Sequence, residues 1–437
     1  MRILVAMFEG GGNLSLILPI VARLVERGHD VRVLAGPNVR AGRPPMSERF
    51  LPRIRATGAT PVVLATPTPH PFEGANFGWT PRWLDRLTPN CAPLVWSWAW
   101  AEGVRDELAR APADAVAADF ILLGALAGAE AAGVPAAALV HGTWKHRPAP
   151  GIPPYGTGFL PSRTVLGRLR AAPFNALFAY RFRRDGLPPL NEARRRLGLP
   201  PLRSPFAQFD RADRVLMLSS AAFDMPPDPL PQNVHYVGAP IERASDVSWR
   251  SPWPADDPRP LVLVGLSTLR QGQGPLMHRV IRAVGELPVR ALVTLGPSLD
   301  RSEFTAPPNT AIEAFVPHDL VMPLAAAMVT QCGLGTLAKA LAFGLPLVCI
   351  PILADQPGNA ALVVGHGAGA RLSPSASPRD IARAIMRVLS EPRFREAAAR
   401  LRSRIAGEDG ALNAAINVEL LADRKTHWPA MVRDLSS

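Results

Sequence analysis

Two separate series of short apolar strands alternate with amphipathic helices along this chain of 437 residues. The first series begins with a predicted strand at 3–7 and a predicted helix at 14–27, and further predicted strands follow at 31–34, 115–118 and 135–140. Two neighbouring parallel strands need a long crossover connection, usually a helix. The alternation therefore predicts a parallel sheet with helices on both faces.

A second series of the same kind begins after a proline-rich stretch that ends near residue 260. Its predicted strands lie at 261–266, 289–294, 328–330 and 347–350, and its predicted helices lie at 275–286, 319–327 and 335–343. The chain is too long for one ordinary core, so the two series indicate two domains. We expect an α/β protein with two Rossmann-like, doubly wound domains that face each other across a cleft.

The proline-rich stretches also predict where the domains begin and end. We expect a first domain at 1–225, an interdomain linker at 226–258, a second domain at 259–425 and a tail at 426–437 that could return to the first domain. The segments 40–100 and 144–165 have weak periodicity and many prolines. Irregular segments beside a rigid sheet often carry the variable half of a binding site.

The composition is that of a soluble globular protein, with 48% hydrophobic and 19% charged residues. Proline or charge interrupts every apolar run well before the roughly 18 residues that span a bilayer. The apolar run at 3–8 is short and lacks a small-residue cleavage site, which favours a buried first strand over a signal peptide. The cysteines Cys91, Cys332 and Cys349 form no close pair and no metal-ligand spacing. We therefore expect a cytoplasmic protein without an integral membrane segment.

The net charge of +12 comes mostly from arginine. Such a charge can indicate a nucleic-acid partner. Here the basic residues are scattered, or clustered in one helical region at 181–196, without a recognition motif or interleaved aromatic residues. We therefore expect no nucleic-acid partner, and we interpret the charge as solvated helix faces and attraction for an anionic small molecule.

The predicted helix 335–343 begins at the turn Gly333-Leu334-Gly335. A helix N-terminus carries about half a positive charge and several unpaired N–H groups, which suit a pyrophosphate. The glycines remove Cβ atoms that would hold the anion away, and Thr336 adds a hydroxyl donor. The same sequence would also suit a tight strand–helix turn without a ligand.

Polar residues and glycines follow three other predicted strands of the second series. Ser267 and Thr268 follow 261–266, Gly296 follows 289–294, and Asp355 and Gln356 follow 347–350. The carboxyl ends of parallel strands meet at one edge of a sheet, where α/β folds bind ligands. A carboxylate beside an amide suits sugar hydroxyls. This edge therefore predicts a ligand with a phosphate-rich middle and a hydroxyl-rich end.

With these motifs, residues 261–372 resemble the donor-binding domain of the nucleotide-sugar-dependent glycosyltransferases with the GT-B fold. The resemblance is strongest to bacterial macrolide- and antibiotic-type enzymes related to the UDP-glucuronosyl- and UDP-glucosyltransferases. It rests on Phe315-Val316-Pro317-His318, on Thr330 to Thr336, on Gly344 to Val348 and on Asp355 to Ala360. The glycines at 10–12 and the segment 27–31 also match the family.

The resemblance implies a role for each matching position. Val316 and His318 would hold the nucleobase, and Asp355 and Gln356 the sugar hydroxyls. Residues around the diphosphate would be Ser267, Gly296, Gly333, Gly335 and Thr336, and Thr268 would also belong to the donor site. Gln331 stands where the family has a phosphate-contacting His, and its amide retains an N–H₂ donor. The co-substrate would be a UDP- or TDP-linked sugar, and neither a metal nor another cofactor is implied.

The general base is the point at which this sequence departs from the family. Asn13 occupies the position of the usual His, and an amide cannot take a proton from an acceptor hydroxyl. The family's partner carboxylate is present as Asp119. Three alternatives remain: Asp119 is the base, His141 is the base, or Asn13 merely orients an acceptor that needs little deprotonation.

We therefore expect an inverting, metal-independent hexosyltransferase that acts on a hydroxyl or nitrogen of a small, hydrophobic acceptor. The tryptophans of the variable segment could bind such an acceptor or could pack its helices; they are Trp79, Trp83, Trp96, Trp98 and Trp100. The alternative is a degenerate protein that binds a nucleotide sugar and assists an active glycosyltransferase. The absence of His at Asn13 and Gln331 motivates that alternative. An epimerase or a phosphorylase lacks support, because we find no suitable acidic and His residues around the sugar and no lysine motif.

Overall fold

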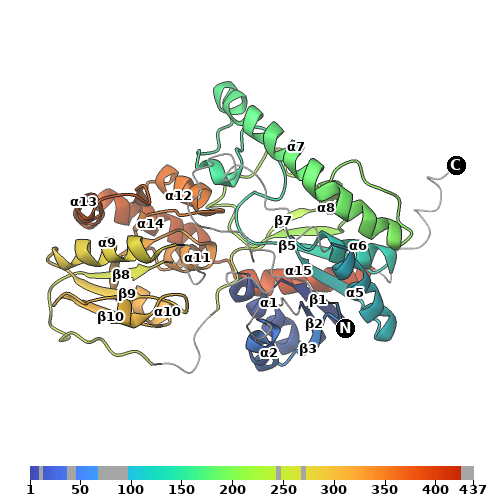
Figure 1. Ribbon diagram of the computed structural model, residues 1–437, viewed down its shortest axis with the longest axis horizontal. Helices are drawn as coiled ribbons and strands as arrows, with labels where there is room; N and C mark the ends of the chain where they lie inside the picture. The colour runs from blue at the N-terminus through green and yellow to red at the C-terminus, as the bar shows by residue number, and fades with distance from the viewer. Residues whose placement is uncertain (9–12, 37–45, 67–96, 243–247, 267–271, 425–437) are drawn as a thin grey trace.

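The computed structural model contains two parallel sheets, each with helices packed against it (Figure 1). It describes residues 1–8, 13–36, 46–66, 97–242, 248–266 and 272–424. The α/β class with two doubly wound sheets confirms the predicted fold. In Figure 1 the first sheet lies on the right and the second on the left. No helix among the described residues is long and apolar enough to cross a membrane.

The first sheet has seven parallel strands in the order β3-β2-β1-β4-β5-β6-β7. Their bounds are β1 Arg2–Met7, β2 Asp30–Ala35, β3 Thr60–Val63, β4 Ala115–Asp119, β5 Ala136–Val140, β6 Arg214–Met217 and β7 Val234–Tyr236. The order reverses between β1 and β4, which pair directly. The carboxyl ends of these two strands are therefore a topological switch point, where open α/β sheets bind ligands.

The helices of the first domain cover both faces of this sheet. They are α1 Leu14–Glu26, α2 Met46–Ala56, α5 Ser97–Arg110, α6 Leu123–Ala131, α7 Val165–Arg196, α8 Ala207–Asp210 and the short η1 Tyr155–Thr157. Helix α6 is apolar nearly all round and buried, and α5 packs against it. A Cβ atom at Gly124 would lie 2.0 Å from the backbone oxygen of Ser97. Only glycine permits this close approach of the two helices.

The second sheet has six parallel strands in the order β10-β9-β8-β11-β12-β13. These strands are β8 Leu261–Gly265, β9 Arg290–Thr294, β10 Thr310–Glu313, β11 Ala325–Thr330, β12 Leu347–Cys349 and β13 Gly369–Arg371. The accompanying helices are α9 Gly274–Gly285, α10 His318–Val321, η3 Met322–Leu324, α11 Leu334–Ala342, α12 Gln356–Gly365, α13 Pro378–Ser390 and α14 Pro392–Ile405. A further short turn, η2, spans Arg301–Glu303.

The predicted helix at 319–327 is wrong in its second half. Helix α10 ends at Val321, and the segment Ala325–Thr330 is strand β11. Pro323 lacks a backbone N–H and cannot continue the helical hydrogen bonds. The alanines then pair with β8 in the middle of the sheet. Burial between two strands outweighs the helical preference of alanine.

Two boundaries also differ from the expected ones. Strand β7 lies inside the expected linker 226–258, but it pairs with β6 and belongs to the first sheet. Helix α15, Gly410–Arg424, was expected in the second domain, yet it packs against α1 and β4 of the first. Its buried face carries Ala414, Ala415, Val418, Leu421 and Ala422, which join the core beneath α1. The helical spacing of these apolar residues gives it a face that α1 can cover.

The carboxyl ends of the two sheets meet. Leu334, at the start of α11, lies in the same apolar cluster as residues of α1. Arg371 Nη1 donates to the backbone oxygen of Gly158 at 2.7 Å, and His366 Nε2 donates to that of Phe223 at 2.7 Å. These contacts bring the end of β4 and the start of α11 to one place.

Candidate active site

Asp119, the last residue of β4, is completely buried at the switch point. Asn13 Nδ2 donates to its Oδ2 at 2.8 Å, and the backbone N–H of Ile121 donates to its Oδ1 at 3.2 Å. Asn13 stands at the N-cap position of α1 but makes no side-chain cap bond there. Its amide is used to orient the Asp119 carboxylate instead.

Burial raises the pKa of Asp119 to about 7. The hydrogen bonds from Asn13 and Ile121 and the positive charge of Lys145 oppose that rise, because each stabilises the ionised form. Desolvation outweighs them. The carboxylate therefore changes charge close to neutral pH, where a general base is most useful.

His141 directly follows β5 and is buried beside Asp119. Its Nε2 lies 3.6 Å from Asp119 Oδ2, which is longer than a hydrogen bond. Among the described residues, neither ring nitrogen has a hydrogen-bond partner. Burial and the charge of Lys145 lower the pKa of His141 to about 3. The three expected residues Asn13, Asp119 and His141 thus come together, with the imidazole neutral.

The start of α11 faces this cluster from the second domain. A Cβ atom at Gly335 would lie 3.3 Å from Ser15 Oγ of α1, and one at Gly142 would lie 3.4 Å from Leu334 Cδ2. Gly333 is the N-cap residue of α11. Thr336 lies in its first turn, where N–H groups have no partner within the helix. The expected phosphate turn therefore lies opposite the end of β4.

Gln331 lies at the end of β11, directly before this turn, and is buried. When its amide is oriented to satisfy its surroundings, the nitrogen donates to the backbone oxygens of Gly265 and Leu266, both at 3.2 Å. These two hydrogen bonds link the end of β11 to the end of β8. The following residue, Cys332, has a φ of 66°, an unusual conformation for a residue other than glycine.

The residues expected at the nucleobase lie between β10 and α10. Val316 is buried, and His318 begins α10. The Thr294 hydroxyl donates to the backbone oxygen of Val264 at 3.1 Å, so the His318 Nε2, 2.8 Å from the same hydroxyl, must donate to it. Burial lowers the pKa of His318 to about 4, so the ring is neutral with its proton on Nε2. Its Nδ1 is then an acceptor.

The residues expected at the sugar follow β12. Asn359 Nδ2 donates to Asp355 Oδ2 at 3.1 Å and to the backbone oxygen of Cys332 at 2.9 Å. Gln356 Oε1 accepts from the backbone N–H groups of Ile352 and Leu353 at 2.7 and 3.0 Å. Gln356 therefore shapes the loop, and Asn359 couples the Asp355 carboxylate to the phosphate turn.

Lys145 and Asn359 belong to the site, although the sequence reasoning did not select either. Lys145 Nζ lies 3.5 Å from Asp355 Oδ2 and 5.4 Å from the centroid of the Phe120 ring. Thr143 Oγ1 donates to Asn359 Oδ1 at 3.4 Å. The contacts from Lys145 to Asp355 and from Thr143 to Asn359 join the two domains. The sequence contains one feature that could have pointed to Lys145, since it is one of only three lysines among 48 basic residues.

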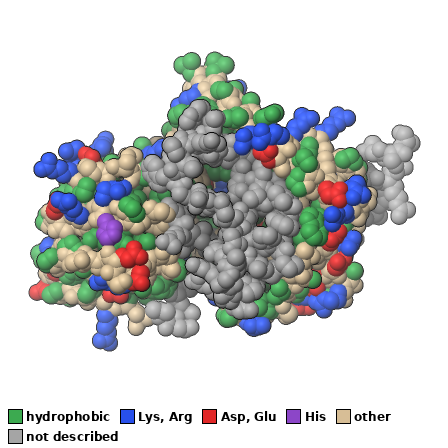
Figure 2. Space-filling model, viewed as in Figure 1, with side chains coloured by type: hydrophobic (Ala, Val, Ile, Leu, Met, Phe, Trp, Pro, Cys, Tyr) green, Lys and Arg blue, Asp and Glu red, His purple; other side chains and the backbone are tan. Residues whose placement is uncertain are grey.

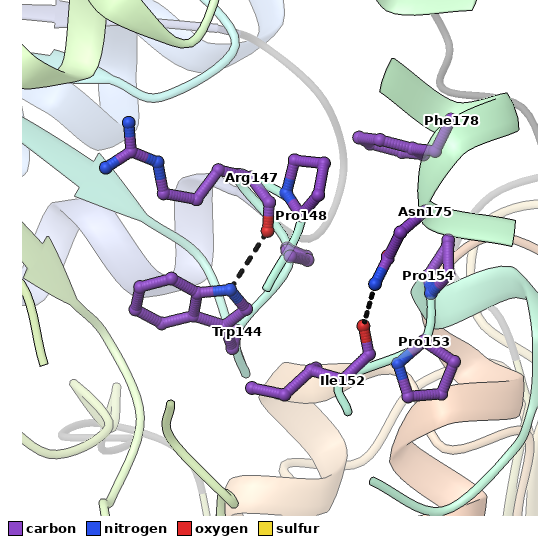
Figure 3. A pocket seen from close by; sticks show the side chains of 9 residues that line it. Trp144, Arg147, Pro148, Ile152, Pro153, Pro154, Asn175 and Phe178 are labelled. Carbon is purple, nitrogen blue, oxygen red and sulfur yellow. Dashed lines mark hydrogen bonds between the residues drawn. The ribbon is translucent and has the colours of Figure 1, made fainter. Parts of the chain in front are cut away.

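A small pocket of about 10 Å³, enough for about one water molecule, lies beside Lys145 between the loop after β5 and α7 (Figure 3). Its lining is mostly apolar: Trp144, Lys145, Arg147, Pro148, Ile152, Pro153, Pro154, Asn175 and Phe178. Trp144 Nε1 donates to the backbone oxygen of Arg147 at 2.9 Å, and Asn175 Nδ2 donates to that of Ile152 at 3.0 Å. These two bonds fix the wall of the pocket.

Some of the expected residues lie elsewhere. Ser267 and Thr268, like Trp79, Trp83 and Trp96, lie outside the described residues. Gly296 has a φ of 68° after β9, at the edge where the site lies. Trp100 is buried in the first core, and Trp98 packs against it with Arg196 Cζ 4.8 Å from its ring centroid. These two tryptophans therefore pack helix α5, which is the alternative we had left open.

The two facing parallel-sheet domains have the architecture of the GT-B class. The solved glycotransferase of kitacinnamycin superposes with a TM-score of 0.72 at 21% identity, covering 96% of this chain and 98% of that one. The glycosyltransferase VinC in complex with dTDP gives a TM-score of 0.66 at 18% identity, covering 97% and 100%. At such identities the likeness establishes the fold.

Sequence similarity establishes the family. The chain is 30% identical to 4'-demethylrebeccamycin synthase of Lentzea aerocolonigenes over 438 residues, 96% of this chain and 99% of the relative. Residues 278–418 match the family described as erythromycin biosynthesis protein CIII-like, C-terminal domain. The chain therefore belongs to the antibiotic-type glycosyltransferases, enzymes that glycosylate natural products. The full-length match to such enzymes does not favour the alternative of a degenerate auxiliary protein.

Proposed function

We propose that the protein transfers a sugar, with inversion at the anomeric carbon, from a nucleoside-diphosphate sugar to a hydroxyl or nitrogen of a small hydrophobic acceptor. The observation that carries this proposal is the buried Asp119 carboxylate, held by Asn13 opposite the N-terminus of α11. A base on one side and a phosphate-binding helix on the other leave the anomeric carbon between them. That is the arrangement an in-line displacement needs.

Asp119 is the general base in this proposal. Its pKa of about 7 leaves about half of the carboxylates ionised at neutral pH, and each can take the proton of the acceptor. His141 has a pKa of about 3 and is a weaker base. Asn13 positions the carboxylate. As the acceptor oxygen or nitrogen bonds to the anomeric carbon, the bond to the diphosphate oxygen breaks and its electron pair leaves with the nucleoside diphosphate.

The start of α11 would stabilise that departing charge. Its unpaired N–H groups and the Thr336 hydroxyl supply donors, and the helix dipole adds about half a positive charge. The part of the chain that the structure describes holds no group of three His, Cys, Asp or Glu side chains arranged to bind a metal ion. The proposed reaction uses neutral donors and the helix dipole and requires no resident cofactor.

Asp355 would accept hydrogen bonds from the sugar hydroxyls, with Lys145 and Asn359 fixing its carboxylate. His318 and Val316 would hold the nucleobase, His318 by its Nδ1 acceptor. We propose a TDP- or UDP-linked donor, and the dTDP named for the VinC structure supports the first. The acceptor would lie beside the Asp119 carboxylate, which has to reach the proton of the attacking group.

The test is an assay with a panel of UDP- and TDP-sugars and aromatic acceptors that carry hydroxyl or N–H groups. We expect release of nucleoside diphosphate together with a glycosylated product whose anomeric configuration, read by NMR, is opposite to that of the donor. Asp119→Asn should slow product formation by at least about a hundredfold while donor binding, measured by calorimetry, persists. Retention of configuration would contradict the proposal, and so would donor binding without turnover of any acceptor.

A further inference from the structure

Helix α7 exposes a continuous apolar stripe that the other described residues do not cover. Four large side chains on it are mostly exposed: Val165 at 73%, Leu166 at 80%, Leu169 at 65% and Tyr180 at 60%. Ala172, Pro173 and Ala176 lie between them and are exposed as well. At 3.6 residues per turn these seven positions fall within a sector of about 120° and extend roughly 22 Å along the helix.

The opposite face of α7 supplies the contacts that hold the helix in place. Gly167, Ala171 and Phe178 are buried there, and Phe178 and Asn175 line the pocket shown in Figure 3. The outer stripe therefore contributes little to folding. An exposed apolar surface of this size on a soluble protein usually marks an interaction site.

Arginines border the stripe. The segment 148–184 contains six arginines and no acidic residue: Arg163, Arg168, Arg170, Arg181, Arg183 and Arg184. Around the helix, Arg168 falls on one flank of the stripe and Arg170 and Arg181 on the other. Among the described residues, Arg168, Arg170 and Arg183 form no ion pair, whereas Arg184 pairs with Asp185 at 2.6 Å.

The shape of this surface distinguishes between possible partners. The first turns of α7 project beyond the two sheets (Figure 1), and Figure 2 shows hydrophobic side chains gathered on this projecting end with basic side chains beside them. A projecting ridge reaches a flat lipid surface without hindrance from the two sheets, whereas the arginines on both flanks would repel a second copy of the same helix. An apolar helix face with basic flanks is typical of helices that lie in the headgroup region of a bilayer.

We propose that α7 docks the enzyme on the surface of an anionic membrane. Val165, Leu166, Leu169 and Tyr180 would enter the boundary between headgroups and acyl chains, and the flanking arginines would bind lipid phosphates. The docking does not depend on the proposed reaction.

The experiment is co-sedimentation of the full-length protein with vesicles of phosphatidylcholine alone or with about a third phosphatidylglycerol. We expect binding to the anionic vesicles that weakens as salt is added, and little binding to the neutral ones. The variant Leu166→Glu/Leu169→Glu should bind roughly a hundredfold more weakly, since two buried leucines are lost. Arg168→Gln/Arg183→Gln should lose about fivefold for each charge removed.

Leu420→Glu is the matched control, because Leu420 is 43% exposed on α15, away from α7. It should bind vesicles like the wild type. Absence of vesicle binding, or unchanged binding by the leucine pair variant, would overturn the proposal. The proposal would also be overturned if light scattering showed that the wild type is a dimer and the leucine pair variant a monomer, because the stripe would then join two copies. A marked fall in the melting temperature of the pair variant would show that the stripe is packed, and would overturn it too.

Discussion

Replacing Asp119 with Asn separates the contribution of this residue to catalysis from its effect on stability. The amide has the shape of the carboxylate, and its oxygen can still accept from Asn13 Nδ2 or from the Ile121 N–H. The substitution removes the charge, the ability to take a proton and one of these two hydrogen bonds, because the amide nitrogen cannot accept. We expect turnover to fall by about 10²- to 10⁴-fold, the usual contribution of a general base.

The same substitution should stabilise the protein above neutral pH. The pKa of Asp119 is raised from 3.8 to about 7 by burial, so its contribution to stability is fully present below about pH 4 and is lost as the pH rises through 7. Keeping the ionised form buried then costs on the order of 4 kcal/mol. Asparagine carries no charge at any pH. At pH 8 we expect the variant to exceed the wild type by roughly 2–4 kcal/mol in the free energy of unfolding, and at pH 4 the difference should disappear.

Urea unfolding at pH 4, 6 and 8, followed by tryptophan fluorescence, measures this difference directly. Asp300→Asn is the control, because Asp300 is exposed and hydrogen bonds from the Ser302 N–H and hydroxyl lower its pKa. It should gain no stability at pH 8. If Asp119→Asn is no more stable than the wild type at pH 8, the carboxylate does not carry a raised pKa and the argument for it as the base fails.

Two further substitutions test the contacts around the site. Lys145→Met removes a charge that lowers the pKa of Asp119, so the acidic limb of kcat/KM against pH should move to higher pH. KM for the donor should also rise, because Asp355 loses the partner of its carboxylate. An unchanged pH profile would contradict the first expectation. Thr294→Val removes the acceptor for His318 Nε2, and we expect donor KM to rise about tenfold, equivalent to about 1.4 kcal/mol, with kcat little changed. A fall in kcat at constant KM would instead indicate that His318 acts in the chemical step.

The sequence pattern predicted the site best where local rules decide its geometry. Parallel strands that end in polar residues place those residues at one edge, so Asp119, Asp355 and the α11 turn could be named from their positions after strands. Lys145 could not, because it lies in an irregular loop and its ion pair with Asp355 joins residues more than 200 positions apart. Nothing in the pattern around a loop residue says which domain it will contact.

The fold was likewise predictable where local rules decide it and unpredictable where distant contacts do. The central strands and α1 follow from periodicity, but α7 extends over 32 residues through Pro173, Pro188 and Pro189. Proline normally indicates a helix end, since it removes a hydrogen bond and clashes with the preceding turn. In α7 the burial of Phe178 and Leu190 outweighs that local cost. Tertiary packing of this kind cannot be read from neighbouring residues.

The return of α15 to the first domain affects the order in which the protein can fold during synthesis. Domains usually fold as they leave the ribosome, the N-terminal one first. Here the surfaces of α1 and β4 that contact α15 remain uncovered until Gly410–Arg424 has emerged from the ribosome. By then the whole second sheet has already been synthesised. The growing chain must keep this apolar surface from aggregating throughout that interval. A fragment that ends after β7 should therefore be insoluble, and supplying α15 as a separate peptide should rescue it.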